Sequence, residues 1–155
     1  MRVVASIIQN LEETRRRSIK IWESIPETYW HWKTDSTSMS LIETVRHILD
    51  GDEWYKQHIQ DRDTVNLNYE KIFGERTYLS IQNELEINRK SRSDFITYLQ
   101  SFSDSDLDTI LIMRRNGTKS LSLFLTEIAY HEAFHAGQIQ LCLRILHVPR
   151  ENIWD

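Results

Sequence analysis

The sequence predicts an all-α protein that folds as a four-helix bundle with long connections. Residues that break helices are scarce, with 4 Gly and 2 Pro among 155 residues, which favours long helices over the many turns of a β-fold. Apolar residues recur every three or four positions along four long segments, which is the spacing of one helix face. Four such helices bury their apolar faces most simply against one another, as a bundle does.

Two helices are expected in the first half of the chain. The first spans Val3–Ile25, and Pro26 ends it because a residue before proline is pushed out of the helical region. A connector with three aromatic residues follows over Glu27–Met39. The motif Ser40–Glu43 has the form of a capping box and begins a second helix that reaches about Ile59.

The second half is expected to contain two more helices. Asp61–Arg76 is polar and shows no period, so it is interpreted as a long connection, and Tyr78–Phe102 has the spacing of a third helix. Asp108–Lys119 is ambiguous: its turn signal Asn116-Gly117 fits a short hairpin, but an ordered loop would also fit. The last helix is expected over Ser120–His147.

Composition and charge limit the number of domains, the cellular compartment and the kinds of partner that we expect. No repeat or change in composition divides the chain, so residues 1–155 are expected to form one domain. The net charge of -4 gives no excess of positive charge for nucleic acid, and the basic run Arg15–Arg17 is interpreted as a solvated helix face. The chain has no signal-peptide pattern and no run that could span a bilayer, and its single cysteine, Cys142, fits a reducing compartment. We therefore expect a cytoplasmic protein with no nucleic-acid or membrane partner.

The strongest functional signal is the stretch 131–135, His-Glu-Ala-Phe-His. Stepping by three or four from Ile128 leads to His131, Glu132 and His135, so three ionisable side chains occupy positions assigned to the interior. Burial of such groups without partners is costly, and a bound divalent metal would compensate for it. Two histidines four residues apart lie on one helix face and can share one ion. The simpler alternative is a pair of core histidines, each satisfied by a hydrogen bond.

A third ligand is not fixed by this pattern. His47 and His58 are the candidates, both on the second expected helix, and periodicity does not choose between them. Glu132 would be the general base if the stretch were the H-E-x-x-H motif of zinc peptidases. The extended metzincin form is excluded, because Gln138 and Leu141 stand where it needs Gly and His.

Two stretches resemble motifs of the DinB/YfiT-like superfamily. Tyr130–Ile139 carries a His, a second His four residues later and then Gly-Gln followed by an aliphatic residue, as members typically do. Ser40–Ile48 resembles the earlier motif of the family, with Ser at a helix start and His seven residues on, and Trp54 matches an aromatic residue often found after that His.

The resemblance implies a bundle with a three-histidine metal site. It carries ligand roles onto His47, His131 and His135, and so favours His47 over His58. Many members have a further His immediately before the last ligand, where this chain has Phe134, so the resemblance carries no proton-transfer role onto this position.

Three more residues are candidates for the surroundings of the metal. Glu132 could be a base or a partner that orients a ligand, while Gln138 and Trp54 could support the ligands or line the pocket. Three neutral histidines leave coordination positions open, which is typical of catalytic metal sites, and Zn²⁺ and Ni²⁺ are the ions expected.

The resemblance also suggests a reaction, because some members are metal-dependent thiol transferases. We therefore expect a small metal-dependent enzyme that joins a low-molecular-weight thiol to a small-molecule electrophile, in detoxification or stress response. A metal-dependent hydrolase with an activated water, and a metal-binding bundle with no enzymatic activity, are the alternatives. A homodimer is implied by the resemblance alone.

Overall fold

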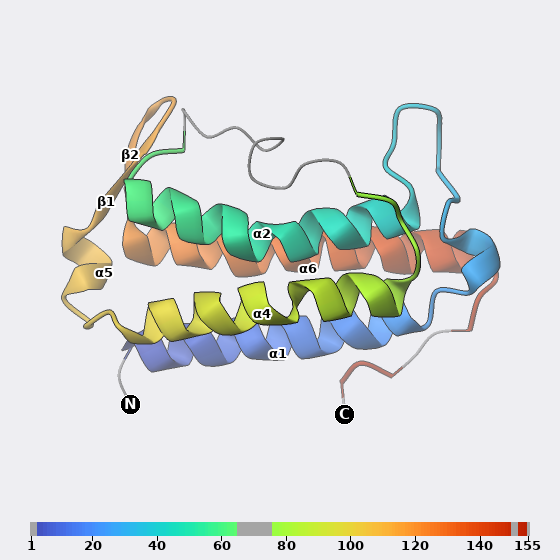
Figure 1. Cartoon of the computed structure of the whole chain (residues 1–155), viewed down its shortest axis with the longest axis horizontal. Coiled ribbons are helices and arrows are strands. Elements are labelled where there is room, and N and C mark those ends of the chain that lie inside the picture. Colours follow the sequence, from blue (N-terminus) through green and yellow to red (C-terminus); the bar gives the residue numbers. More distant parts are fainter. Residues whose placement is uncertain (1–2, 65–75, 150–151, 155) are drawn as a thin grey trace.

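The structure, a computed structural model, describes residues 3–64, 76–149 and 152–154. Four long helices form the predicted bundle, which confirms the fold class (Figure 1): α1 Val3–Glu23, α2 Leu41–Asp61, α4 Ile81–Gln100 and α6 Leu121–Ile145. The shorter elements are the 3₁₀ helix η1 Glu27–Tyr29, helix α5 Asp106–Thr109 and strands β1 Leu111–Arg114 and β2 Gly117–Ser120. Within these described ranges, none of the helices has the length and apolarity needed to cross a bilayer.

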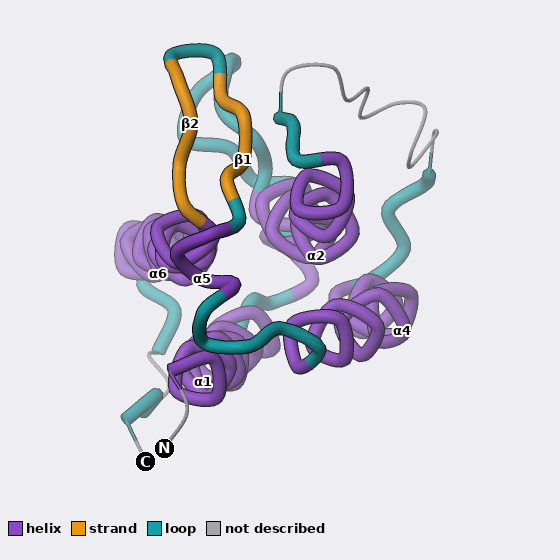
Figure 2. Tube along the Cα trace, turned by 90° about the vertical axis from the view of Figure 1, so that its left-hand side faces the viewer, coloured by secondary structure: helices purple, strands orange, loops and turns teal. Residues whose placement is uncertain are grey.

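The bundle does not have a simple up-down-up-down order. Viewed from its end, α1 lies between α4 and α6, and α2 lies diagonally opposite α1 (Figure 2). Helices α1 and α6 run in one direction while α2 and α4 run in the other (Figure 1). The connector between α1 and α2 therefore has to cross the end of the bundle, which explains its length.

The helix ends follow their capping residues. The predicted capping box is present, because the Ser40 amide donates to Glu43 Oε2 over 2.6 Å and the Glu43 amide donates to Ser40 Oγ over 3.3 Å. Helix α4 begins three residues later than the predicted Tyr78, because the hydroxyl of Ser80 accepts from the Asn83 amide. Most of the predicted long connection, residues 65–75, lies outside the described residues.

The ambiguous segment before the last helix is a hairpin. Its strands pair antiparallel from Leu111 opposite Ser120 to Arg114 opposite Gly117, so residues 115 and 116 form the turn. Gly117 takes the positive φ of 121°, which glycine adopts without strain. The short helix α5, which the sequence pattern did not predict, packs its buried Leu107 into the core beside the hairpin.

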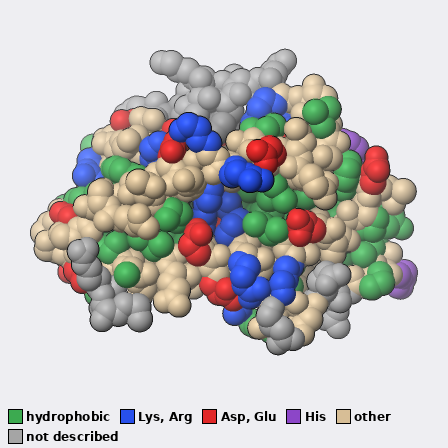
Figure 3. Space-filling view, turned by 60° about the horizontal axis from the view of Figure 1, so that its bottom comes forward, with side chains coloured by type: hydrophobic (Ala, Val, Ile, Leu, Met, Phe, Trp, Pro, Cys, Tyr) green, Lys and Arg blue, Asp and Glu red, His purple; other side chains and the backbone are tan. Residues whose placement is uncertain are grey.

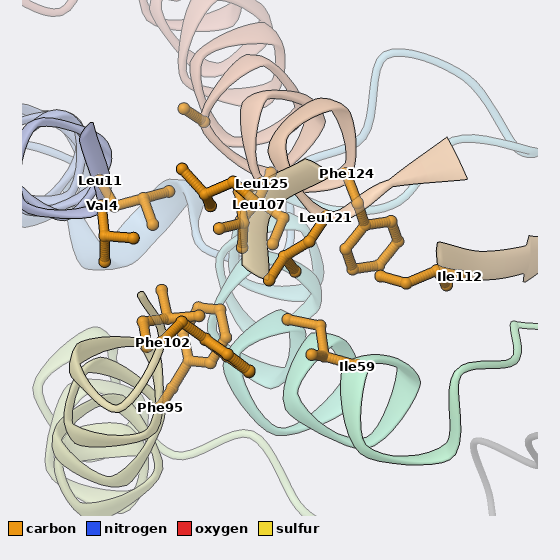
Figure 4. Packing of buried hydrophobic residues seen from close by; sticks show 13 residues of the cluster. Val4, Leu11, Ile59, Phe95, Phe102, Leu107, Ile112, Leu121, Phe124 and Leu125 are labelled. Atoms are coloured by element: carbon orange, nitrogen blue, oxygen red, sulfur yellow. The ribbon is translucent and has the colours of Figure 1, made fainter. Parts of the chain in front are cut away.

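The core consists of two apolar clusters separated by a polar layer. One cluster lies at the hairpin end and includes Phe95 and Phe124 (Figure 4); the other lies at the connector end and includes Trp22. Between the clusters each long helix contributes a buried polar or charged side chain: Arg15 from α1, Asp52 from α2, Asn88 from α4 and Glu132 from α6.

His58 is buried in the bundle among aromatic side chains. Its ring centroid lies 4.7 Å from that of Trp54 and 6.0 Å from that of Phe124. Neither ring nitrogen has a hydrogen-bond partner in the part of the chain that the structure describes. Burial, with a smaller contribution from the charge of Arg114, lowers the pKa of His58 to about 4, so the ring is neutral at pH 7.

The low pKa of His58 predicts a dependence of stability on pH. In the unfolded chain the pKa of a histidine is about 6.5, so between pH 6.5 and 4 the unfolded chain binds a proton that the folded chain does not. The free energy of unfolding therefore falls as the pH is lowered through this window. His58→Leu should weaken this dependence and raise the free energy of unfolding at pH 7 by about 1 kcal/mol, because it removes a buried polar group without a partner.

Urea unfolding at pH 7 and pH 5, in the presence of a chelator, measures both effects. His31→Leu is the matched control, because His31 is exposed. An equal pH dependence in His58→Leu and in the control would contradict the account.

Candidate metal centre

Three histidines from two helices meet at the side of the bundle. His47 comes from α2, and His131 and His135 come from consecutive turns of α6. The Nε2 atom of His131 lies 3.1 Å from Nε2 of His47 and 3.1 Å from Nε2 of His135. One ring nitrogen from each of the three histidines can serve as a ligand atom, and these three atoms all lie within 4.8 Å of one another. His58, the other candidate considered for the third position, is not part of this cluster.

The arrangement suits a cation better than it suits hydrogen bonds alone. A ring nitrogen carries either one hydrogen or one lone pair, so His131 Nε2 cannot form well-directed hydrogen bonds with both neighbours. An ion between the rings would accept all three lone pairs. Zinc bound to nitrogen at 2.0–2.1 Å with tetrahedral geometry separates its ligand atoms by about 3.3 Å, close to the spacing found here. The residues present therefore fit a divalent ion.

Two side chains orient the rings of α6 from behind. The Tyr55 hydroxyl lies 2.9 Å from His131 Nδ1, and Gln138 Oε1 lies 2.7 Å from His135 Nδ1. If each Nδ1 carries the hydrogen and donates it, each Nε2 presents its lone pair to the cluster. Gln138 thus contacts a candidate ligand, His135, as expected for a residue that supports the ligands. The sequence pattern placed Tyr55 only on the apolar side of its helix. Its position two turns after His47 could have indicated that its hydroxyl lies near the metal ligands.

The three rings are neutral at pH 7. Burial and the charges of His135 and His47 lower the pKa of His131 to about 4. Burial also lowers the pKa of His47, with a smaller effect of His135, and it lowers the pKa of His135 against the opposing effect of Gln138. Neutral imidazole is the form that binds a metal, so these shifts keep the site available to an ion in mildly acidic solution.

The side chain of Glu132 is not part of the histidine cluster. It is 4% exposed, and its two carboxylate oxygens accept from Arg15, Oε1 from Nε over 2.9 Å and Oε2 from Nη2 over 3.1 Å. Both oxygens are therefore engaged by a guanidinium. This geometry favours a supporting role for Glu132, in which it fixes the position of α6, over the role of a proton acceptor.

Arg15 joins Glu132 to the other helices. Its Nη1 donates to Asp52 of α2 over 3.0 Å and to Asn88 of α4 over 3.2 Å. Burial disfavours its charge, yet the carboxylates of Asp52 and Glu132 raise the pKa of Arg15, so it stays protonated. Arg92 donates to Asp52 as well, over 2.9 Å, so two cations balance two carboxylates in the layer.

The interpretation of the basic run as a solvated face is wrong for one of its members. Arg15 is 6% exposed and belongs to the polar layer. Arg16 and Arg17 do lie toward the surface, and each pairs with Glu13 over 2.7 Å. Acidic and basic side chains are interspersed on the face that α1 and α4 form (Figure 3). Adjacent residues of a helix point in different directions, so one of three adjacent arginines can face the interior while the other two face solvent.

Three cavities border the cluster, each beside a different histidine. A cavity of about 310 Å³ lies beside His135, one of about 370 Å³ beside His47 and one of about 440 Å³ beside His131. Trp54, which was expected at the pocket or behind the ligands, lines none of these three and packs against His58 instead.

Comparison with known proteins agrees with the resemblance seen in the motifs. A profile of the DinB superfamily matches residues 10–139, so the chain belongs to this superfamily. No curated protein matches the sequence significantly. A DinB-like protein from Bacillus subtilis is 19% identical, with a TM-score of 0.72 over 95% of this chain and 96% of its own. A DinB-like protein from Bacillus cereus is 17% identical, with a TM-score of 0.73 over 94% of this chain and 95% of its own. At these identities the likeness shows a common fold.

Removing the groups that orient the rings should weaken metal binding. Gln138→Leu and Tyr55→Phe each leave one Nδ1 without its partner, and we expect each to raise the Kd for zinc by about 10- to 100-fold. Competition against a chromophoric chelator measures the affinity. Gln140→Leu and Tyr98→Phe are the matched controls, outside the cluster, and an equal loss of affinity in the controls would contradict the assignment.

The lowered pKa values predict how metal binding depends on pH. Three rings with the ordinary pKa near 6.5 would lose about a thousand-fold in affinity at pH 5.5, because three protons compete with the ion. Since all three pKa values are lowered, the loss between pH 7.5 and 5.5 should fall well short of that factor. Zinc titrations at both pH values test this, and a full thousand-fold loss would show rings with ordinary pKa values.

Proposed function

We propose that the chain binds one divalent ion, Zn²⁺ or Ni²⁺, through His47, His131 and His135 and uses it as a thiol S-transferase. The observation that carries the proposal is the convergence of three neutral imidazoles beside cavities that can hold two reactants, in a cluster to which no carboxylate of the described residues belongs. Imidazole ligands suit zinc and nickel alike.

Three ligands leave coordination positions open for a reactant. A divalent ion at such a site acts as a Lewis acid that lowers the pKa of a bound thiol. Tyr55 and Gln138 hold the rings of α6 in the orientation that binding requires. The cavity walls hold the second reactant near the thiol sulfur, so that the reaction gains from proximity.

The surroundings of the cluster favour transfer over hydrolysis. Hydrolysis by the H-E-x-x-H pattern needs a carboxylate that takes a proton from water, and both oxygens of Glu132 are bound to Arg15. A thiol gives up its proton to solvent more readily than water does, and no base on the protein is then needed. In the transfer a bond forms between sulfur and carbon, and the leaving group departs with the electron pair of the bond that breaks.

A conjugation assay with a panel of small thiols and 1-chloro-2,4-dinitrobenzene tests the proposal. We expect His135→Ala to lose the metal and to lower the metal-dependent rate by about 100-fold or more, because a ligand is gone. Glu132→Gln, compared at a temperature where it is folded, should keep the metal and most of the rate. His58→Leu is the control, since it removes a histidine outside the cluster.

Three results would contradict the proposal. The first is full turnover by a His135→Ala variant that holds no metal. The second is ester hydrolysis without conjugation, abolished by Glu132→Gln, which would indicate a hydrolase. The third is a large fall in the melting temperature on chelation with no reaction of thiols or esters, which would indicate a metal that only stabilises the bundle.

A further inference from the structure

We propose that the cavity beside His135 is a binding site for an uncharged, apolar small molecule. The cavity lies between the connector and the C-terminal half of α6, and none of the residues that line it is an Asp, Glu, Lys or Arg. Its volume of about 310 Å³ is at the lower end of the range of small-molecule sites, so it suits a molecule of about one substituted ring.

The walls of the cavity are mainly apolar. Trp32 and Met39 come from the connector, and Ile139, Leu141 and Ile145 come from α6. Met39, Leu141 and Ile145 are 43%, 56% and 52% exposed and line the same cavity, and exposed apolar side chains gathered in one place mark a surface that binds a ligand or a partner. A bound apolar molecule would cover them and gain the free energy of their burial.

Several polar groups of the cavity already have partners within the protein. The Thr44 hydroxyl donates to the Ser40 carbonyl over 2.9 Å, and Gln138 Oε1 is held by His135. Few hydrogen bonds therefore remain for a ligand. A charged molecule would lose its hydration here without compensation, whereas an uncharged apolar molecule would not.

The cavity beside His47 has the opposite character. Lys33, Glu43 and Arg46 line it, so its walls are charged, with Lys33 paired to Glu43 over 3.0 Å and Arg46 paired to Glu84. The two cavities share Ser38 and Met39 as a common wall. Reactants of different polarity would therefore approach the three histidines from the two sides of Met39.

If the chain is the transferase proposed above, the bound molecule is one of its two reactants. This role rests on the proposed function, whereas the binding itself does not. The molecule in the apolar cavity is the electrophile. Its carbon forms the bond to sulfur, its leaving group departs as an anion with the electron pair, and the proton of the thiol goes to solvent.

Equilibrium dialysis of the full chain with two unreactive probes tests the binding. We expect 1,3-dinitrobenzene, which is neutral, to bind at least about tenfold more tightly than 3,5-dinitrobenzoate, which carries the same ring and a charge. The comparison uses metal-free protein, because a carboxylate could coordinate the ion, and the neutral probe is also measured with zinc-loaded protein.

Leu141→Lys places a charge in the wall of the cavity at an exposed position, so folding is preserved. It should weaken binding of the neutral probe about tenfold and strengthen binding of the benzoate. Leu123→Lys is the matched control, because Leu123 is 59% exposed on the same helix and lines none of the three cavities.

Equal binding of the two probes, or equal effects of the two lysine variants, would overturn the proposal. Selective binding of the neutral probe without any conjugation would support the site and overturn the transfer reaction, so the two proposals fail separately.

Discussion

The buried guanidinium of Arg15 is the interaction on which the rest of the structure depends. It lies between two apolar clusters and joins Glu132 of α6 to Asp52 of α2, the two helices that carry the candidate metal ligands. Buried charges are tolerated only when they are paired, and removal of one partner typically costs about 3–5 kcal/mol. The pairing thus opposes any sliding of α2 or α6 along α1. Because Glu132 adjoins His131 in the sequence, the same contact fixes the height at which the rings of α6 meet His47.

The residues around the histidine cluster account for the protonation state and the orientation of its rings. Burial keeps the three rings neutral, and Tyr55 and Gln138 orient the rings of His131 and His135. Arg15 engages both oxygens of Glu132, and among the described residues the cluster consists of imidazoles. A site of three imidazoles could hold a divalent ion and would leave coordination positions open. The fold alone would not lead to this conclusion, since one fold serves many functions, and the argument depends on the side chains of this chain.

Local patterns predicted much of this structure. Scarce helix breakers and apolar periodicity were sufficient for the bundle, and the spacing of Ser40 and Glu43 predicted a cap. Asn116-Gly117 indicated a turn, which left a hairpin and an ordered loop as alternatives, and the structure has the hairpin. Each of these signals lies within a few residues of the feature that it predicts. The pair of histidines on α6 was found for the same reason, because four residues separate them on one helix face.

Contacts between distant segments could not be predicted in this way. Periodicity places Glu132 on the inner face of α6, but it does not reveal that Arg15, 117 positions earlier, holds both of its oxygens. The choice between His47 and His58 had the same difficulty, because both lie near the edge of the apolar face of α2. The packing of α2 against α6 brings His47 to the cluster and leaves His58 buried against Phe124.

X-ray absorption spectroscopy of the zinc-loaded protein tests the central claim most directly. The account predicts three imidazole ligands at about 2.0–2.1 Å, and, after addition of a small thiol, one sulfur at about 2.3 Å without loss of an imidazole. Fewer than three imidazoles, or a coordination shell that the thiol leaves unchanged, would contradict it.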